Sequence, residues 1–210
     1  MLHAIQLLID HGLSGYLMII TGVFAILVSV DRIYHLYFKV NFDAKNVIEK
    51  IQPQIISRNY SQALQICNTV KNSAELNVIK EGLMALESGR EAINSAITSS
   101  VMEFSRSCEK RLSYLSLIAS AATLIGLFGT IMGLIKTFEA IAGADPAEKG
   151  KLLGLGISEA MHSTAAGVIV GVFAMVVHTV CVAKTDSVVG KAQDIALKLV
   201  KWIEQSERGS

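Results

Sequence analysis

The chain alternates between long stretches without charged side chains and segments of ordinary polarity. Three stretches carry none or almost none: His11–Val30, Leu112–Ile135 and Leu152–Ala183, the last interrupted only by Glu159. A helix rises about 1.5 Å per residue, so about 20 apolar residues cross the hydrocarbon core of a membrane. The first stretch is not preceded by the basic residues of a signal peptide. We therefore predict three transmembrane helices.

The charged residues at the ends of these stretches set the expected boundaries. We predict transmembrane helices at residues 13–31, 112–137 and 153–183. Residues 1–12 form a short N-terminal segment and residues 32–111 a helical domain. Residues 138–152 form a loop and residues 184–210 a C-terminal helix.

The distribution of basic residues predicts the orientation. No Lys or Arg precedes the first span, eleven lie between the first and second spans, and five follow the third. Loops rich in Lys and Arg stay on the cytoplasmic side. We expect residues 1–12 and 138–152 in the periplasm, and residues 32–111 and 184–210 in the cytoplasm.

Helical periodicity marks the segments outside the spans. Val47, Ile48 and Ile51 share one face, and we expect Pro53 to end that helix. A second helix is expected from Tyr60 to Val70.

Further helices are expected on either side of the second span. Asn72 and Glu75 form a capping pair for a helix that Gly89 closes. From Glu91 no Pro or Gly occurs before Gly126, so this helix is expected to continue into the second span. A helix is also expected at residues 186–207, and no strand-like alternation of useful length occurs. The expected fold is all-α: an integral membrane protein with three transmembrane helices and long helices extending into the cytoplasm.

Composition supports a membrane protein and narrows its chemistry. Of 210 residues, 51% are hydrophobic and only 18% are charged, and the net charge is +1. A nucleic-acid partner would need a basic excess on one face, so none is expected. Three widely spaced cysteines predict free thiols. Nucleotide-binding, hydrolase and metal-ligand motifs are missing from the sequence. We expect no enzymatic activity, cofactor or metal.

The polar residues inside the spans carry the functional hypotheses. Glu159 lies roughly 10 Å along the third span by helical rise, and an ionisable group at such a position is costly and often functional. It either lines a water-filled ion route or is a structural carboxylate. His162, one turn further, either relays protons or is a neutral, hydrogen-bonded side chain.

Hydroxyl and glycine residues form a stripe along the second and third spans. Thr123, Thr130 and Thr137 recur every seven residues and share one helix face. The accompanying residues are Gly126, Gly129 and Gly133 in the second span, and Ser163, Thr164, Gly167 and Gly171 in the third. Small residues allow close helix packing, so the stripe is either a packing seam or the polar lining of an ion path. Thr130 and Thr164 are expected at similar depth.

Two sequence motifs resemble a known family. Leu124-Ile-Gly-Leu-Phe-Gly-Thr-Ile-Met-Gly-Leu-Ile-Lys-Thr-Phe138 is similar to the second-span motif of the MotA/TolQ/ExbB proton channel family. Gly156-Ile-Ser-Glu-Ala-Met-His-Ser-Thr-Ala-Ala-Gly167 resembles the third-span motif. The three-span layout resembles ExbB and TolQ rather than four-span MotA.

The resemblance implies roles for particular residues. The pore-facing threonines of the family fall on Thr130 and Thr164, and its third-span acid falls on Glu159. The polar pair His162-Ser163 departs from the usual apolar or small residues, which leaves proton and sodium open as the transported ion.

The resemblance also implies partners in the bacterial inner membrane. We expect a homo-oligomeric ring in contact with membrane lipid, typically a pentamer, around two spans of an ExbD- or TolR-like protein. Through a TonB- or TolA-like protein or a gliding-type partner, this motor would use the proton motive force to energise an outer-membrane process. The alternatives are a sodium-driven motor and a non-conducting structural scaffold.

Overall fold

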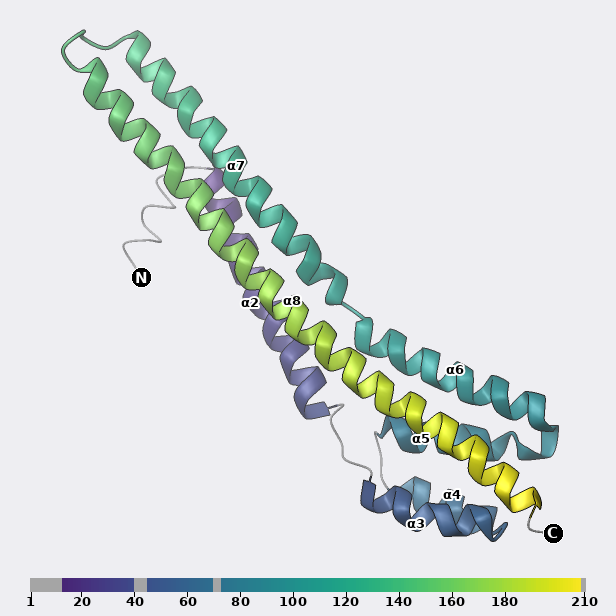
Figure 1. Cartoon of the computed structure of the whole chain (residues 1–210). Coiled ribbons are helices and arrows are strands. Elements are labelled where there is room, and N and C mark those ends of the chain that lie inside the picture. Colours follow the sequence, from purple (N-terminus) through teal and green to yellow (C-terminus); the bar gives the residue numbers. More distant parts are fainter. Residues whose placement is uncertain (1–12, 40–44, 70–72, 209–210) are drawn as a thin grey trace. The chain divides into compact units, whose positions relative to one another are not determined.

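The computed structural model describes residues 13–39, 45–69 and 73–208. Within these ranges the regular structure is entirely helical, and no strand occurs. The elements in chain order are α2 (Leu13–Tyr34), η1 (His35–Lys39), α3 (Lys45–Ile56), α4 (Tyr60–Thr69), α5 (Ala74–Met84), η2 (Leu86–Ser88), α6 (Arg90–Glu109), α7 (Leu112–Ala142) and α8 (Lys149–Arg208) (Figure 1). The expected all-α fold is confirmed.

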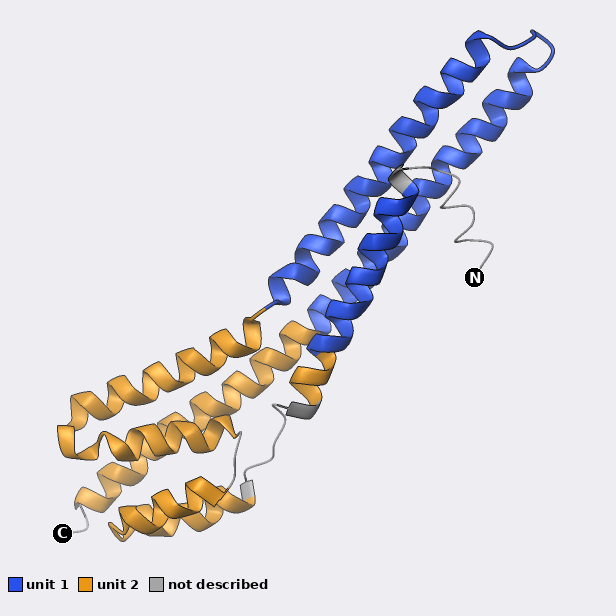
Figure 2. Cartoon of the chain, turned by 180° about the vertical axis from the view of Figure 1, so that it is seen from behind, with its two compact units in different colours: residues 1–32, 111–180 blue, residues 33–110, 181–210 orange. Residues whose placement is uncertain are grey.

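The helices fall into two compact units. Unit 1 contains residues 1–32 and 111–180, and unit 2 contains residues 33–110 and 181–210 (Figure 2). The expected N-terminal segment, residues 1–12, lies outside the described residues. The long helix α8 contributes residues to both units.

Unit 1 contains the uncharged stretches of the chain apart from residues 181–183, which belong to unit 2. In it α7 and α8 run antiparallel, side by side, and α2 packs against them. A small apolar core joins the three helices through Ala25, Ile118, Ala119 and Ala174. Three helices of the described chain are long and apolar enough to cross a membrane, as the charge pattern predicted. Large apolar side chains such as Leu27, Leu124 and Ile169 stay exposed on their outer faces.

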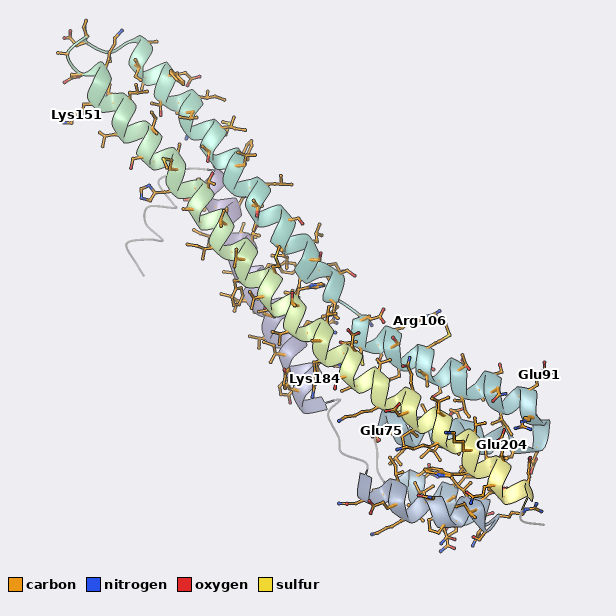
Figure 3. The ribbon with its side chains drawn as sticks, viewed as in Figure 1. Glu75, Glu91, Arg106, Lys151, Lys184 and Glu204 are labelled. Atoms are coloured by element: carbon orange, nitrogen blue, oxygen red, sulfur yellow. The ribbon has the colours of Figure 1, made fainter. Side chains whose placement is uncertain are left out.

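Unit 2 has a conventional hydrophobic core. The buried side chains come from α3, α4, α5, α6 and the last part of α8: Ile51, Ile55, Ala63, Cys67, Leu76, Val78, Ile79, Leu83, Ile93, Ile97, Ala192, Ile195, Leu199, Trp202 and Ile203. They recur at helical spacing, so each helix buries one apolar stripe. The charged side chains Glu91 and Arg106 point outward from α6 (Figure 3).

Pro53 does not end its helix, contrary to the expectation from the sequence. The helix α3 continues through Pro53 to Ile56, and the Ser57 amide donates to the Pro53 carbonyl at 3.0 Å. Ile51 and Ile55, on either side of the proline, are both fully buried. Their burial stabilises the helical backbone across Pro53, and the loss of one backbone bond near the end of a helix is tolerated.

The helix α5 is capped one residue later than expected. The Ser73 hydroxyl accepts a hydrogen bond from the Leu76 amide at 3.4 Å, whereas the expected cap, Asn72, lies outside the described residues. At the other end, Gly89 closes the short turn η2 with φ +93°. This backbone conformation favours glycine, in line with the expected role of Gly89.

We expected the helix that begins at Arg90 to continue into the second span, but it does not. It ends at Glu109, and α7 begins at Leu112. Arg111, between them, has a left-handed backbone with φ +69°. No proline or glycine marks this break in the sequence.

Polar contacts tie the end of α8 into unit 2. The Arg58 guanidinium donates to the Ser206 carbonyl through Nε and Nη2, at 3.1 and 2.9 Å. The hydroxyls of Tyr60 and Ser206 lie 3.1 Å apart. Arg90 on α6 forms an ion pair with Glu204 on α8. These contacts hold α8 against the α3–α4 turn and α6.

Candidate ion-pathway site

The helices α7 and α8 of unit 1 approach each other at glycines. A Cβ atom built on Gly167 would lie 2.6 Å from the Ala122 carbonyl oxygen and 2.9 Å from the Gly126 Cα. A Cβ on Gly171 would lie 2.9 Å from the Ala119 carbonyl oxygen. Real Cβ atoms do not fit at these distances, so only glycine permits this close helix contact.

The glycines of α7 lie along the same contact. A Cβ on Gly126 would lie 3.0 Å from the Ser163 carbonyl oxygen, and one on Gly133 would lie 3.0 Å from the Ala160 Cβ. Gly129 is buried as well. The structure therefore places four of the glycines predicted for helix packing, Gly126, Gly133, Gly167 and Gly171, directly between α7 and α8.

The threonine stripe of α7 follows this contact. The Thr123 hydroxyl would lie 2.9 Å from a Cβ on Gly171, and the Thr137 Cβ would lie 2.7 Å from a Cβ on Gly156. The outer threonines donate within their own helix, from Thr123 to the Ala119 carbonyl at 3.3 Å and from Thr137 to the Gly133 carbonyl at 2.7 Å.

The middle of the stripe contains a hydroxyl pair that bridges the helices. Thr130 on α7 and Thr164 on α8 are hydrogen-bonded through their Oγ1 atoms. The Thr130 hydroxyl also lies 3.3 Å from the carbonyls of Gly126 and Ala160, and the Thr164 hydroxyl lies 3.3 Å from the same Gly126 carbonyl. Both threonines are half-buried. The structure thus brings together the two residues that were predicted to share a depth.

The number of protons in this cluster limits its hydrogen bonding. Each hydroxyl has one proton to donate and two lone pairs to accept. Thr164 can donate to Thr130, which then donates to a carbonyl, or Thr130 can donate to Thr164, which donates to Gly126. Both directions satisfy every proton, so the pair can reverse its donor direction by hydroxyl rotation. Such a pair can solvate a proton or a carboxyl group that comes next to it.

Glu159 and Ser163 flank the pair on α8. Ser163 is buried, and its backbone carbonyl faces Gly126. Glu159 is exposed in the described chain. At about 100° per residue it lies a quarter turn from Ala160, whose carbonyl contacts Thr130. The carboxylate therefore lies beside the contact with α7 rather than within it.

His162 lies on a different face of α8. Its Nδ1 lies 2.6 Å from the Ser158 carbonyl oxygen of the preceding turn. Together with Met161 and Ala165, these residues line a shallow surface hollow. His162 follows Ala160 by two residues, which corresponds to a rotation of about 200° around the helix axis. The imidazole ring therefore points away from the face of α8 that meets α7. The described chain does not bring His162 to the threonine pair.

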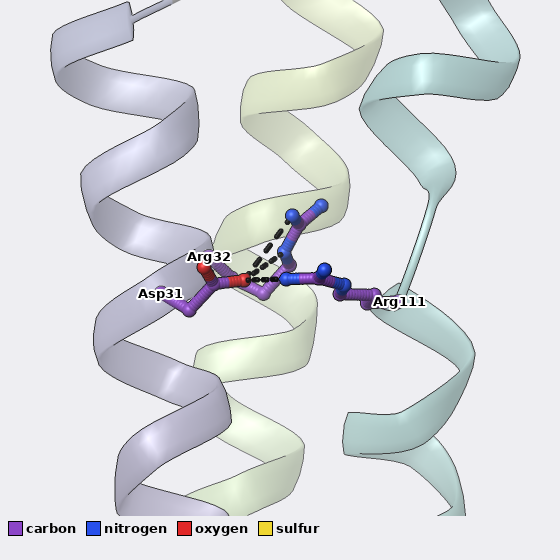
Figure 4. A network of polar contacts seen from close by, with 3 residues as sticks. All are labelled: Asp31, Arg32 and Arg111. Atoms are coloured by element: carbon purple, nitrogen blue, oxygen red, sulfur yellow. Dashed lines mark hydrogen bonds and ion pairs between the residues drawn. The ribbon is translucent and has the colours of Figure 1, made fainter.

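A charged cluster at one end of unit 1 was not anticipated from the sequence. Asp31 on α2 accepts from Arg32 through Nε and Nη2, both at 3.3 Å, and from Arg111 through Nη1 at 3.0 Å (Figure 4). One carboxylate oxygen thus receives both guanidinium groups. A signal existed in the sequence, since Asp31 and Arg32 directly follow the first uncharged stretch and Arg111 directly precedes the second.

The three apolar helices and the threonine pair define a class of protein. The chain is an all-helical membrane protein with a hydroxyl pair held between two closely packed spans. The model of the MotA/TolQ/ExbB proton channel family matches residues 70–194, more than half of the chain. The protein belongs to the MotA/TolQ/ExbB proton channel family, and the resemblance stated from its motifs is confirmed.

Individual relatives carry the family's names. A putative ExbB homolog of Methanothermobacter thermautotrophicus is 22% identical over 91% of this chain and 67% of its own length. TolQ of Haemophilus influenzae is 36% identical over 34% of this chain and 31% of its own length. ExbB of Salmonella typhimurium is 25% identical over 67% of this chain and 56% of its own length. The chain thus spans about two thirds of the first relative and less of the other two.

A solved structure shares the fold. The structure of C. jejuni MotAB has a TM-score of 0.64 with this chain, covers 92% of it and 78% of the MotAB chain, and is 15% identical. Together with the apolar helices, these comparisons support a multi-pass protein of the inner membrane in a proton channel family.

Proposed function

We propose that this protein is the ion-conducting subunit of an inner-membrane motor. In the proposed complex it uses the proton motive force, together with an ExbD- or TolR-like single-span partner, to energise an outer-membrane process. The N-terminus and the α7–α8 loop would face the periplasm, and unit 2 would face the cytoplasm, in line with the distribution of basic residues.

The Thr130–Thr164 pair is the observation that carries the proposal. A seam that served only for packing would be satisfied by glycine and alanine, whereas here two hydroxyls from different helices bond to each other and share carbonyl acceptors. Because the donor direction of this pair can reverse, it can alternately donate to and accept from a partner's carboxyl group. This chemistry suits the loading and release of a proton.

The energy for such a motor comes from the electrochemical potential of ions across the membrane. One elementary charge that crosses 100 mV releases about 2.3 kcal/mol. The sequence has no nucleotide-binding motif, and we propose a non-enzymatic role in which ion flow alone supplies the work.

We propose a homo-oligomer around the partner's spans, with a pentamer as the expected form. The exposed apolar side chains of unit 1, among them Leu27, Leu124 and Ile169, supply faces for neighbouring copies and for lipid. The shared fold with C. jejuni MotAB supports an assembly of similar helices.

Two alternatives make different predictions. A sodium-driven version of the motor would keep the threonine pair, but its flux would follow the sodium gradient. A non-conducting scaffold would need the glycines alone and would conduct no ions.

The decisive experiment removes the hydroxyls without changing the shape of the side chains. Thr130→Val, Thr164→Val and the double variant would be co-expressed with the single-span partner, purified as the complex and reconstituted into vesicles. Proton flux would be measured with a pH-sensitive dye inside the vesicles under a proton gradient, and sodium flux with a sodium-sensitive dye under a sodium gradient.

We expect each single variant to lose at least tenfold in proton flux and the double variant to lose all of it, with the complex intact by mass. Thr179→Val is the matched control, because Thr179 is exposed and donates to the Met175 carbonyl within its own helix α8. Full flux in the double variant would contradict the proposal.

A further inference from the structure

The Asp31–Arg32–Arg111 cluster has more positive than negative charge at the edge of the apolar part of unit 1. Two guanidinium groups meet one carboxylate, so the cluster has a net charge of +1. The neighbouring residues Val30 and Leu112 belong to uncharged stretches. The cluster therefore lies where a membrane-spanning segment would end, at the depth of phospholipid headgroups.

The two arginines differ in exposure. Arg32 is only 3% exposed. The side chains of Arg111 and Asp31 are 51% and 47% exposed. A guanidinium carries five N–H donors, and the contact of Arg111 with Asp31 uses Nη1 alone. Arg111 can therefore offer further N–H donors to a ligand on its exposed side. The buried guanidinium of Arg32 adds a second positive charge next to this position.

The start of α7 adds to this arrangement. Arg111 is the N-cap residue of the helix and makes no side-chain capping bond. The first amides of a helix and its dipole favour an anion at this end. Tyr114, one turn into α7, is 52% exposed, and aromatic side chains of this kind are typical of the membrane–water interface.

We propose that Arg111, supported by Arg32 and the N-terminus of α7, binds the phosphate of an anionic phospholipid. The planar guanidinium suits phosphate oxygens, which it can bind in a bidentate manner. Asp31 accepts one hydrogen bond from Arg111 at 3.0 Å and partly neutralises the cluster. Basic sites at the ends of membrane helices are common binding positions for anionic lipid headgroups.

Lipid affinity in neutral detergent tests this proposal. The full chain would be titrated with phosphatidylglycerol, phosphatidylcholine or inorganic phosphate, and bound adducts would be counted by native mass spectrometry. We expect phosphatidylglycerol to bind more tightly than phosphatidylcholine, and Arg111→Gln to weaken phosphatidylglycerol binding about fivefold. Lys151→Gln is the matched control. Lys151 lies at the start of α8, beside the α7–α8 loop and so at the opposite end of α7 from Arg111 (Figure 3). The variant removes one positive charge there and should leave phosphatidylglycerol binding unchanged.

Asp31→Asn keeps the test decisive if Arg111→Gln does not fold. This change raises the net charge of the cluster to +2, so phosphatidylglycerol should bind at least as tightly as to the unmodified chain. Equal binding of the two lipids, unchanged binding to a folded Arg111→Gln, or weakened binding to Asp31→Asn would overturn the proposal. Displacement of phosphatidylglycerol by an equal concentration of inorganic phosphate would also overturn it, because the ligand would then be free phosphate. The measurement uses no ion flux, so it is independent of the proposed motor function.

Discussion

A Cβ atom built on Gly167 of α8 would lie 2.9 Å from the Cα of Gly126 on α7, so the two backbones touch at this point. The threonine pair lies close by, because Thr130 and Thr164 both reach the Gly126 carbonyl at 3.3 Å. Close packing and the hydroxyl bridge therefore depend on the same short segment of each helix.

Gly167→Ala should destabilise this contact. The new methyl group would meet backbone atoms, the Ala122 carbonyl oxygen at 2.6 Å and the Gly126 Cα at 2.9 Å, which cannot turn away as a side chain can. We expect a loss of about 1–3 kcal/mol in the free energy of unfolding. Thermal unfolding in detergent, followed by circular dichroism, measures it.

Gly154→Ala is the control on the same helix, because a Cβ there would meet no atom within 4 Å. Replacing a solvent- or lipid-facing helical glycine by alanine stabilises a helix by up to about 1 kcal/mol. If both variants unfolded at the same temperature, the Gly167 contact would not limit the packing of α7 and α8.

Gly82→Ala should have a milder effect in unit 2. A Cβ on Gly82 would lie 2.6 Å from the Leu199 Cδ2 and 2.9 Å from the Ile97 Cγ1. Both are side-chain atoms and can shift by small rotations, so we expect a loss of about 1 kcal/mol. The same unfolding measurement applies, with Gly190→Ala as a control in open space on α8. A loss larger than that of Gly167→Ala would contradict this ranking.

The sequence was sufficient to predict the membrane helices and the polar stripe. Both follow from local regularities, since uncharged stretches such as Leu112–Ile135 depend only on length and composition. The seven-residue spacing of Thr123, Thr130 and Thr137 implies a shared helix face directly. The face of His162 could also have been obtained from its position two residues after Ala160.

The features that were missed depend on contacts between distant residues. The break between α6 and α7 falls on Arg111, whose left-handed backbone coincides with a contact to Asp31, 80 positions earlier in the chain. Local propensity contains no such information. The continuation of α3 through Pro53 likewise depends on the burial of Ile51 and Ile55 in a core built from four other helices. Long-range packing outweighed the local preference in both cases.

Burial raises the pKa of the Cys67 thiol to about 11, from 9.0 for an unperturbed thiol, with a smaller opposing effect of Lys80. The thiolate fraction below pH 9 should therefore be about 100-fold lower than in an unfolded chain. We expect alkylation of Cys67 by iodoacetamide at pH 8 to be slower by at least this factor. Peptide mass mapping separates Cys67 from Cys108 and Cys181. Alkylation at the rate of the unfolded chain would contradict this prediction.

The same shift predicts a loss of stability at alkaline pH. Because the folded-state pKa of Cys67 lies above the unfolded value, its contribution is present below about pH 9 and lost as the pH rises towards 11. Cys67→Ala should remove this part of the pH dependence, although it also opens a small cavity in the core of unit 2. Denaturant unfolding at pH 8 and pH 10.5 compares the two chains. An equal alkaline loss in both would show that Cys67 is not its source.

Glu159→Gln separates a role in conduction from a role in assembly. At an assumed separation of about 10 Å and an effective dielectric constant of about 20, a carboxylate changes the energy of a passing cation by about 1.7 kcal/mol. We therefore expect flux through the reconstituted complex to fall about tenfold or more, while the mass of the complex is unchanged. His162→Gln is the control, because His162 faces away from α7. Ion flux through the His162→Gln complex should stay within about twofold of the flux through the unmodified complex. Loss of the complex in Glu159→Gln would assign the carboxylate a structural role, and unchanged flux with an intact complex would remove it from the ion path.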